Sequence, residues 1–142
     1  MYSWLVRYLL RRVIAQGRAG NIDPTIARYA DDAHFRFPGR SSWAADYHEK
    51  APIAAWLRRF VAVGLQLEPQ EILVRGGPWN TTVSVHFTDC WANAAGEVIY
   101  TNEGVLFGKM AWGKLTAVTV FEDTQKVADF DDYLEAHELD AR

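Results

Sequence analysis

The spacing of apolar residues changes once along the chain, from a helical period to alternation. Apolar side chains recur at helical spacing over residues 3–17 and again from Ala51 up to Gly64, where a glycine ends the stretch. Between these stretches, Asp23-Pro24 predicts a short helix with Asp23 as its N-cap, and we expect that helix to break at Asp31-Asp32. Helices are therefore expected before the period changes.

One short strand interrupts this helical part. Residues 34–37 alternate between polar and apolar side chains, and Pro38-Gly39 ends the alternation. The following segment, which carries Trp43 and Tyr47, shows neither period and is expected to be a loop.

Beyond Gly64, apolar and polar residues alternate, as in strands with one buried face. We expect four strands, at about residues 66–75, 81–91, 97–109 and 114–122, the last two joined by a turn at Trp112-Gly113. Asp123-Thr124 then caps a final helix. Helices, a meander of antiparallel strands and a closing helix predict a single α+β domain over residues 1–142.

Composition limits the classes of function. A length of 142 residues suits one domain, and 49% hydrophobic with 23% charged residues is the balance of a globular protein. At a net charge of −3, the chain lacks the clustered Lys and Arg that binding to nucleic acid requires. Its apolar stretches are too short for a membrane span, and the single Cys90 favours a reducing, cytoplasmic setting.

Motifs for cofactors are missing, whereas aromatic residues are plentiful. The sequence has no P-loop, dinucleotide fingerprint, CxxC or HExxH, and its four histidines are scattered, so we expect no cofactor and no metal. Six Trp, six Tyr and seven Phe are more than a small core needs. They predict a pocket for a small apolar organic molecule.

Several segments resemble a known superfamily. They are the runs GNIDP and ARYADDAHF, the loop GRSSWAADY and the ending WGKLTAVTVFEDTQKV. With the order of elements, they are similar to the nuclear-transport-factor-2-like (NTF2-like) superfamily, and within it to the SnoaL-like polyketide cyclase and ketosteroid isomerase-related branch. The resemblance implies a cone-shaped, cystatin-like domain, in which N-terminal helices pack on a curved antiparallel sheet around a deep pocket. It also implies a closing C-terminal helix and, in many relatives, a homodimer.

The catalytic positions of the best-known relatives carry other residues here. Phe37 stands before Pro38 where ketosteroid isomerases have an aspartate base. His86, Thr88 and Val120 fall where epoxide hydrolases of this superfamily place their Asp–Arg–Asp arrangement. Phenyl and aliphatic side chains do not transfer protons, so both activities are disfavoured.

A polar trio remains as the predicted catalytic group. His86, Tyr100 and Asn102 are the residue types that the dehydratase branch uses. His86 would be the acid or base because histidine titrates near neutrality, and Tyr100 and Asn102 would hydrogen-bond to a carbonyl or enolate oxygen. Alternation alone sends Val83 and Phe87 to the core and the His86 face to water. The resemblance implies the reverse, with the polar face lining the pocket, and we expect the reverse.

The pocket wall and the dimer face follow from this choice. The predicted substrate-binding residues are Phe35, Phe37, Trp56, Phe60, Thr88, Val118 and Val120. The predicted homodimer surface is the other face of the sheet, with Val83, Val85, Phe87, Val105, Phe107 and Phe121.

Single ionisable residues elsewhere in the sequence give weaker indications of a functional site. Glu122 shares its face with Val120 by alternation, but a carboxylate at a strand end is usually solvated. His34 and His48 have no evident partner.

The leading hypothesis is cofactor-free proton-transfer chemistry, of cyclase, isomerase or dehydratase type, on an apolar cyclic or polyketide-like substrate. The alternatives are a binding module without turnover and a dimeric interaction module.

Overall fold

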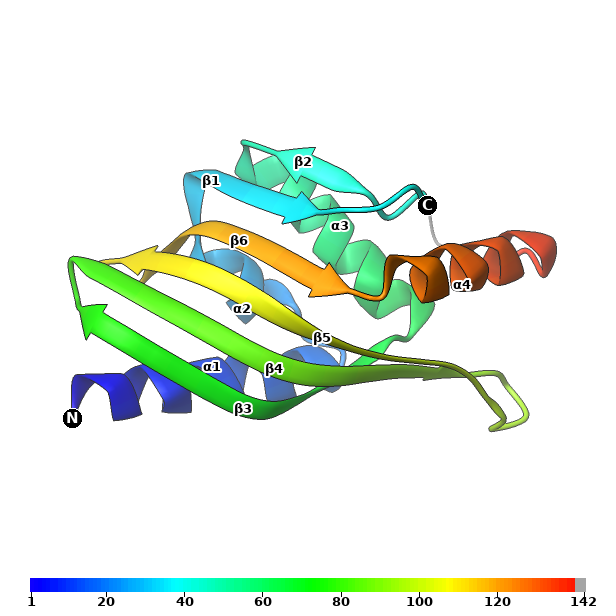
Figure 1. Ribbon diagram of the computed structural model, residues 1–142, viewed down its shortest axis with the longest axis horizontal. Coiled ribbons are helices and arrows are strands. Elements are labelled where there is room, and N and C mark those ends of the chain that lie inside the picture. Colours follow the sequence, from blue (N-terminus) through cyan, green and yellow to red (C-terminus); the bar gives the residue numbers. More distant parts are fainter. Residues whose placement is uncertain (140–142) are drawn as a thin grey trace.

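The computed structural model describes residues 1–139, and Figure 1 shows a curved sheet with helices on one side. The helices are α1 (Tyr2–Arg18), α2 (Asp23–Arg28), α3 (Lys50–Val63) and α4 (Thr124–Ala136). The strands are β1 (Tyr29–Phe37), β2 (Ala45–Tyr47), β3 (Gln66–Gly77), β4 (Asn80–Ala92), β5 (Val98–Ala111) and β6 (Lys114–Glu122). This order confirms the predicted α+β class.

The six strands form one sheet in the order β2-β1-β6-β5-β4-β3. Strands β3 to β6 are an antiparallel meander, whereas β1 runs parallel to β6. The parallel pair places Phe35 beside Val118, so the early strand lies next to the last one. The sheet is therefore mixed at this one pair and antiparallel elsewhere.

The core lies between the sheet and the first helices. In Figure 1, α1, α2 and α3 lie behind the sheet, while α4 continues past the end of β6. Val6 and Leu10 of α1 and Ile53 of α3 are buried against inward side chains of the sheet. Each such buried aliphatic side chain stabilises the fold by about 1.5–3 kcal/mol.

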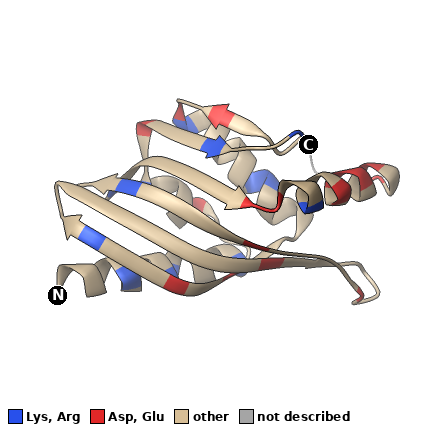
Figure 2. Ribbon diagram, in the orientation of Figure 1, with Lys and Arg blue, Asp and Glu red and all other residues tan. Residues whose placement is uncertain are grey.

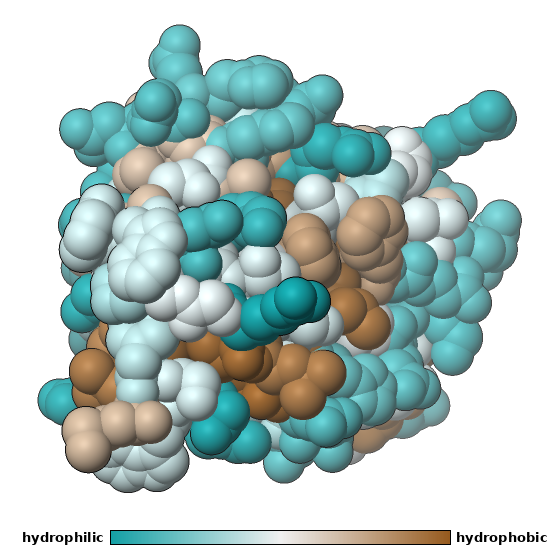
Figure 3. All heavy atoms as spheres, turned by 60° about the vertical axis from the view of Figure 1, so that its left-hand side comes forward, coloured by the Kyte–Doolittle hydropathy of each residue, from teal (hydrophilic) through white to brown (hydrophobic). Residues whose placement is uncertain are grey.

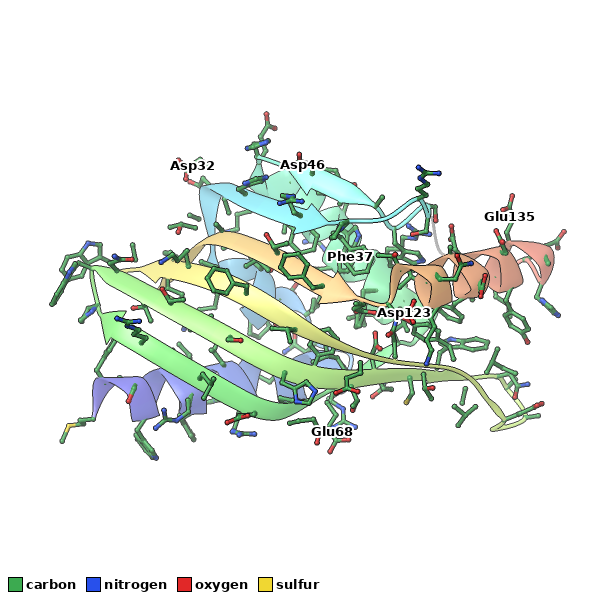
Figure 4. The ribbon with its side chains drawn as sticks, in the orientation of Figure 1. Asp32, Phe37, Asp46, Glu68, Asp123 and Glu135 are labelled. Atoms are coloured by element: carbon green, nitrogen blue, oxygen red, sulfur yellow. The ribbon has the colours of Figure 1, made fainter. Side chains whose placement is uncertain are left out.

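Local signals set several element ends as expected. Gly64 ends α3 in the left-handed conformation, at a φ of 95°, where glycine has no steric penalty. Asp123 caps α4, because its side chain accepts hydrogen bonds from the backbone N–H groups of Gln125 and Lys126. Figure 4 shows Asp123 at the junction of β6 and α4.

The segment between α1 and α3 differs from the prediction. Helix α2 ends at Arg28, and Asp31 and Asp32 belong to β1 rather than to a helix end. Ile22 is the N-cap residue of α2, and Asp23 is the first helical residue. Strand β2, which contains Asp46 (Figure 4), was expected to be a loop; it forms because its backbone pairs with β1 at the edge of the sheet.

The inward face of β4 is the apolar one, so the face assignment taken from the resemblance is wrong for this strand. Val83, Val85 and Phe87 are at most 3% exposed, whereas Ser84 and His86 are half-buried on the outer face. Turning the valine and phenylalanine side chains to the helices removes a continuous apolar row from water, which favours this orientation. Val83, Val85 and Phe87 therefore do not belong to an outer dimer surface.

On β5 the polar residues do face inward, as predicted. Tyr100 and Asn102 are 7% and 5% exposed, and Val105 and Phe107 lie on the outer face. Tyr100 pairs with Trp91, and Asn102 pairs with Asp89. Cross-strand partners share a face, so the register puts Tyr100 and Asn102 opposite to the face of His86.

Candidate active site

A cavity of about 140 Å³ lies between the helices and the sheet. Its walls are almost entirely apolar and come from α1, α2, α3 and five strands, with Phe35, Phe37, Trp56 and Phe60 among the aromatic side chains. For scale, an engineered apolar cavity of about 150 Å³ binds benzene. The space therefore suits a molecule of about one ring.

Glu122 supplies the one carboxyl group among the described residues that line this cavity. It pairs with Gly104 on β5, which in turn pairs with Phe87 on β4. A Cβ atom on Gly104 would lie 2.8 Å from Cγ of Glu122 and 2.9 Å from Cζ of Phe87. Glycine at this position therefore leaves room for the Glu122 side chain over β5.

Asp89 lies close to Glu122. It is the next inward-facing residue of β4 after Phe87. It is only 4% exposed, and burial raises its pKa. Burial and then the charge of Asp89 raise the pKa of Glu122, to about 8, and a hydrogen bond links the two side chains. Two carboxyl groups that are buried together cannot both be ionised cheaply, so the pair holds a proton at neutral pH.

The hydrogen bonds around Asp89 agree with a shared proton. Within residues 1–139, Oδ1 of Asp89 is buried and accepts no hydrogen bond from an N–H or hydroxyl group. A buried carboxylate oxygen without a donor is unfavourable. A proton shared by the two carboxyl groups supplies such a donor, and we assign it to Glu122, whose pKa is raised to about 8.

Tyr100 connects this pair to a buried amide. Its hydroxyl group donates to Oε2 of Glu122 at 3.1 Å and accepts from Nδ2 of Asn102 at 2.9 Å. Burial raises the pKa of Tyr100, and the negative charge of Glu122 raises it further, so the phenol stays protonated. Tyr100 is thus a proton-bearing donor at the carboxyl pair.

The side-chain amide of Asn102 makes all of its hydrogen bonds within the protein. Its Nδ2 also donates to the carbonyl oxygen of Asp123 at 3.1 Å, and its Oδ1 accepts from the backbone N–H groups of Glu103 and Asp123 at 2.8 and 3.4 Å. Both amide hydrogens therefore have acceptors. Asn102 positions Tyr100 and holds the start of α4, and it has no spare donor for a substrate.

A second, smaller cavity of about 20 Å³ adjoins the first. The two share walls, including Trp56 and Glu122, and the small one is also lined by Asp89, Tyr100 and Trp43. A space of about this size holds one water molecule or one ligand atom. Glu122 thus lines both cavities, whereas Asp89 lines only the small one, whose other walls are mostly aromatic and aliphatic.

The predicted substrate-binding residues divide into two groups. Those that line the large cavity are Phe35, Phe37, Trp56, Phe60 and Val120. Val118 is buried in the core but is not among the residues that line either cavity. Thr88 lies on the outer face, where it accepts a hydrogen bond from Gln70 at 3.2 Å. The binding of substrate by the lining residues stays a prediction.

The predicted catalytic trio does not come together. His86 is on the outer face of β4, where its Nε2 lies 2.6 Å from Oε1 of Glu103, and its side chain is 40% exposed. Tyr100 and Asn102 are on the other side of the sheet. His86 therefore cannot act with them on one molecule in the cavity.

Sequence reasoning missed Asp89 and left Glu122 as a solvated residue. The signal for Asp89 was present: it continues the inward row of Val83, Val85 and Phe87, and Trp91 follows it. A carboxylate inside an apolar alternating row is rarely structural without a partner. The partner, Glu122, lies 33 positions further along the chain, and only the register of β4, β5 and β6 brings the two together.

A separate group gathers at the sheet edge. Nε2 of His34 and Nε2 of His48 lie 2.6 and 3.5 Å from Oδ1 of Asp46, and the two imidazole rings stack at 4.2 Å. The hydrogen bond from His34 holds the pKa of Asp46 below its usual range. The expectation that His34 and His48 lack partners is wrong. Two imidazoles and a carboxylate are ligands that transition metals accept, but Asp46 and His48 are largely exposed, and none of the three residues lines the cavity.

Charged residues leave the middle of the sheet largely free. Figure 2 shows acidic residues on α4 and single charges of both signs elsewhere.

Over the described part of the chain, no helix has the length and apolar character to cross a membrane.

Comparisons with known proteins show which solved structures share this fold. No protein-family model matches the sequence, and no curated protein is similar to it. An NTF2-like protein from Burkholderia xenovorans matches at a TM-score of 0.68, with 17% identity over 91% of this chain and 97% of its own. TerC, co-crystallized with polyporic acid, matches at 0.71, with 20% identity over 89% of this chain and 97% of its own.

A proposed polyketide cyclase from Xanthomonas campestris also matches, at a TM-score of 0.61, with 16% identity over 87% of this chain and 93% of its own. These likenesses confirm the NTF2-like, cystatin-like fold that the sequence resemblance implied. At this level of identity they show the fold alone.

Proposed function

We propose that the protein catalyses cofactor-free proton transfer at a carbon next to a carbonyl group, in a small apolar ring compound. The observation that carries this proposal is the buried pair of Asp89 and Glu122 at the wall of an apolar cavity. Such pairs of carboxyl groups with separated roles are typical of acid–base catalysis.

The pair contains an acid and a base at once. Asp89, the carboxylate, takes the proton from the carbon beside the carbonyl, and the electrons of that C–H bond form the enolate. Glu122, the acid, donates its proton or a hydrogen bond to the carbonyl oxygen, supported by Tyr100. Return of a proton to the same carbon gives exchange, and return to a different carbon gives isomerisation.

Apolar surroundings strengthen this chemistry. The aromatic walls exclude water, so the hydrogen bonds to a developing enolate act in a medium of low dielectric constant. They also explain why the carboxyl pair keeps a proton at neutral pH. The substrate would place its ring against Phe37, Trp56 and Phe60 and its oxygen toward Glu122. Two structural neighbours support a ring substrate: TerC was co-crystallized with polyporic acid, and the Xanthomonas campestris protein is described as a polyketide cyclase.

Hydrogen–deuterium exchange tests this proposal without knowledge of the natural substrate. The protein is incubated in D₂O with cyclohexanone, 2-cyclohexenone and acetophenone, and deuterium at the carbons beside the carbonyl is followed by NMR. We expect catalysed exchange of at least one compound. The Glu122→Gln and Asp89→Asn proteins should each lose it by about 100-fold or more, the size of effect that general acid–base catalysis provides.

Glu103→Gln is the matched control, because Glu103 is a carboxylate on the outer face of the same strands. Its exchange rate should equal that of the wild type. If the wild type binds the ketones but exchanges none of them, the protein is a binding module, the second candidate. Equal exchange by wild type and Glu122→Gln would show that the pair has no catalytic role.

We also propose a homodimer through the outer face of the sheet. Leu73, Val105, Phe107 and Phe121 are between 37% and 57% exposed, and register places Val105 beside Phe121. Figure 3 shows hydrophobic atoms that reach the surface of one side between hydrophilic ones. Apolar side chains gathered on one face favour association.

A further inference from the structure

Two histidines and an aspartate come together at the edge of the sheet. His34, Asp46 and His48 form what we call the edge cluster, and Figure 4 shows Asp46 on β2, the outermost strand. Their ligand atoms all lie within 4.8 Å of one another. Among residues 1–139, this is the one such group of His, Cys, Asp or Glu side chains, and none of its members lines either cavity.

The pairing of β1 with β2 builds the cluster. The antiparallel register that pairs Phe35 with Tyr47 continues for one step to the two histidines. Residues two apart on a strand share a face, so Asp46 and both imidazoles project from the same face of the sheet. The expectation of no metal rested on the scatter of the histidines along the chain, and this pairing brings two of them together.

The distances within the cluster are close to those around a coordinated ion. Nε2 of His34 and Nε2 of His48 lie 2.6 and 3.5 Å from Oδ1 of Asp46. A tetrahedral Zn²⁺ ion with bonds of about 2.0–2.1 Å holds its ligand atoms about 3.4 Å apart. One distance is therefore already near this value, and the other needs a shift of less than about 1 Å in side chains that reach solvent.

A histidine beside a carboxylate is not in itself a metal site. His86 and Glu103 make such a pair on the outer face of the sheet, also at 2.6 Å. The edge cluster differs by its second imidazole, which stacks on the first at 4.2 Å with an interplanar angle of 14°. Two imidazoles and a carboxylate on one ion are a frequent ligand set for divalent transition metals.

Asp46 provides the negative charge that a divalent cation requires. The hydrogen bond from His34 holds the pKa of Asp46 below its usual range, so the carboxyl group is ionised. Arg36, the cross-strand partner of Asp46, is the neighbouring cation. Because Arg36 is exposed, solvent and salt screen its repulsion of a bound ion.

We propose that the edge cluster binds one divalent transition-metal ion with the ligand preference of Zn²⁺, and that this ion ties β2 to β1. Nε2 of both histidines and Oδ1 of Asp46 supply three ligands, and water takes the fourth position of a tetrahedral ion. The ion replaces the hydrogen bond between His34 and Asp46. Phe35 stacks on Tyr47 at 6.5 Å and lines the large cavity, so the tie also holds one part of the cavity wall.

Zinc binding to matched variants tests the site. Isothermal titration calorimetry of the full chain with ZnCl₂, at about pH 7.5 where an ordinary imidazole is neutral, should show one bound ion. His34→Gln and His48→Gln should each weaken binding by more than about tenfold, because even loss of a ligand's hydrogen-bond partner costs about 10- to 100-fold.

His86→Gln is the control for that titration. The side chain of His86 is 40% exposed, against 38% for His34, and it has its own carboxylate partner but no second imidazole. Its zinc affinity should equal that of the wild type. A wild type that binds no zinc would overturn the site, and so would equal weakening in all three variants, which would mean that zinc binds exposed histidines indiscriminately.

A paramagnetic probe locates the ion in the wild type, without a variant that must fold. Cu²⁺ binds the same types of ligand more tightly than Zn²⁺ does, and it broadens the NMR signals of nearby nuclei. The amide signals of His34, Asp46 and His48 should disappear first, while those of His86 and Glu103 persist. Loss of both groups of signals at the same Cu²⁺ concentration would contradict a specific site.

Amide hydrogen exchange tests the tie between the strands. Zn²⁺ should slow exchange of the β2 amides in the wild type but not in His48→Gln, and EDTA should restore the faster rate. Unchanged exchange with zinc bound would show that the ion does not hold β2, and the proposed tie would be wrong. None of these results depends on deuterium exchange of ketones, so this proposal and the proposed catalysis succeed or fail separately.

Discussion

The proton held by Asp89 and Glu122 should make the protein less stable as the pH rises toward neutrality. A carboxyl group whose pKa is raised by folding keeps its proton in the folded state and loses it in the unfolded state. Its stabilising contribution is therefore complete below the ordinary carboxyl pKa and is lost as the pH rises through the folded pKa. The window lies between the ordinary value and the raised value of Glu122, about 8.

The size of the effect follows from the number of protons. Between about pH 5 and about pH 7, the folded pair binds at least one proton more than the unfolded chain, so the free energy of unfolding should fall by about 1.4 kcal/mol per pH unit. Over this window that amounts to about 3 kcal/mol, a substantial part of the stability of a typical domain.

Urea denaturation at several pH values measures this slope. Glu122→Gln should remove most of it, because a neutral amide binds no proton there, while the exposed Glu103→Gln control should keep it. The difference in slope between wild type and Glu122→Gln isolates the contribution of the pair from that of the rest of the chain. Parallel curves for these two proteins would refute the shared proton.

Three further outcomes follow from the structure. Asn102→Ala should lower the free energy of unfolding by about 3 kcal/mol, since it leaves buried partners without hydrogen bonds; Asn93→Ala, in an exposed turn, should cost much less in the same urea titration. Asp123→Ala should cost about 1 kcal/mol through loss of the α4 cap, seen as a lower thermal midpoint. Phe107→Glu should convert the proposed dimer to a monomer by light scattering at micromolar concentration; an unchanged mass would contradict that interface.

Much of the fold was predictable because its signals are local. The alternation of the four later strands, the glycine that ends α3 and the aspartate that caps α4 all depend on neighbours in sequence. Strand β2 was not predictable in this way. Its three residues carry no alternation to detect, and it exists only because β1 offers an edge with which to pair.

The site was less predictable because it depends on register. Alternation identified which residues of β4 share a face, but not how that face aligns with β5. A bulge between Trp91 and Ala92 shifts the pairing by one residue, so His86 lies opposite Val105, on the face of the sheet away from Tyr100. The same register brings Asp89 and Glu122 together on the inward face of the sheet. Hairpin geometry of this kind is not encoded in the period of either strand.

The protonation state of Glu122 is the most direct test of the account. Carbon-13 NMR of the side-chain carboxyl groups, recorded as a function of pH and assigned with Glu122→Gln, reports when each group loses its proton. The account predicts that the Glu122 carboxyl is still protonated at neutral pH and titrates well above the ordinary carboxyl range. A Glu122 signal that titrates in the ordinary range, near pH 4, would contradict it.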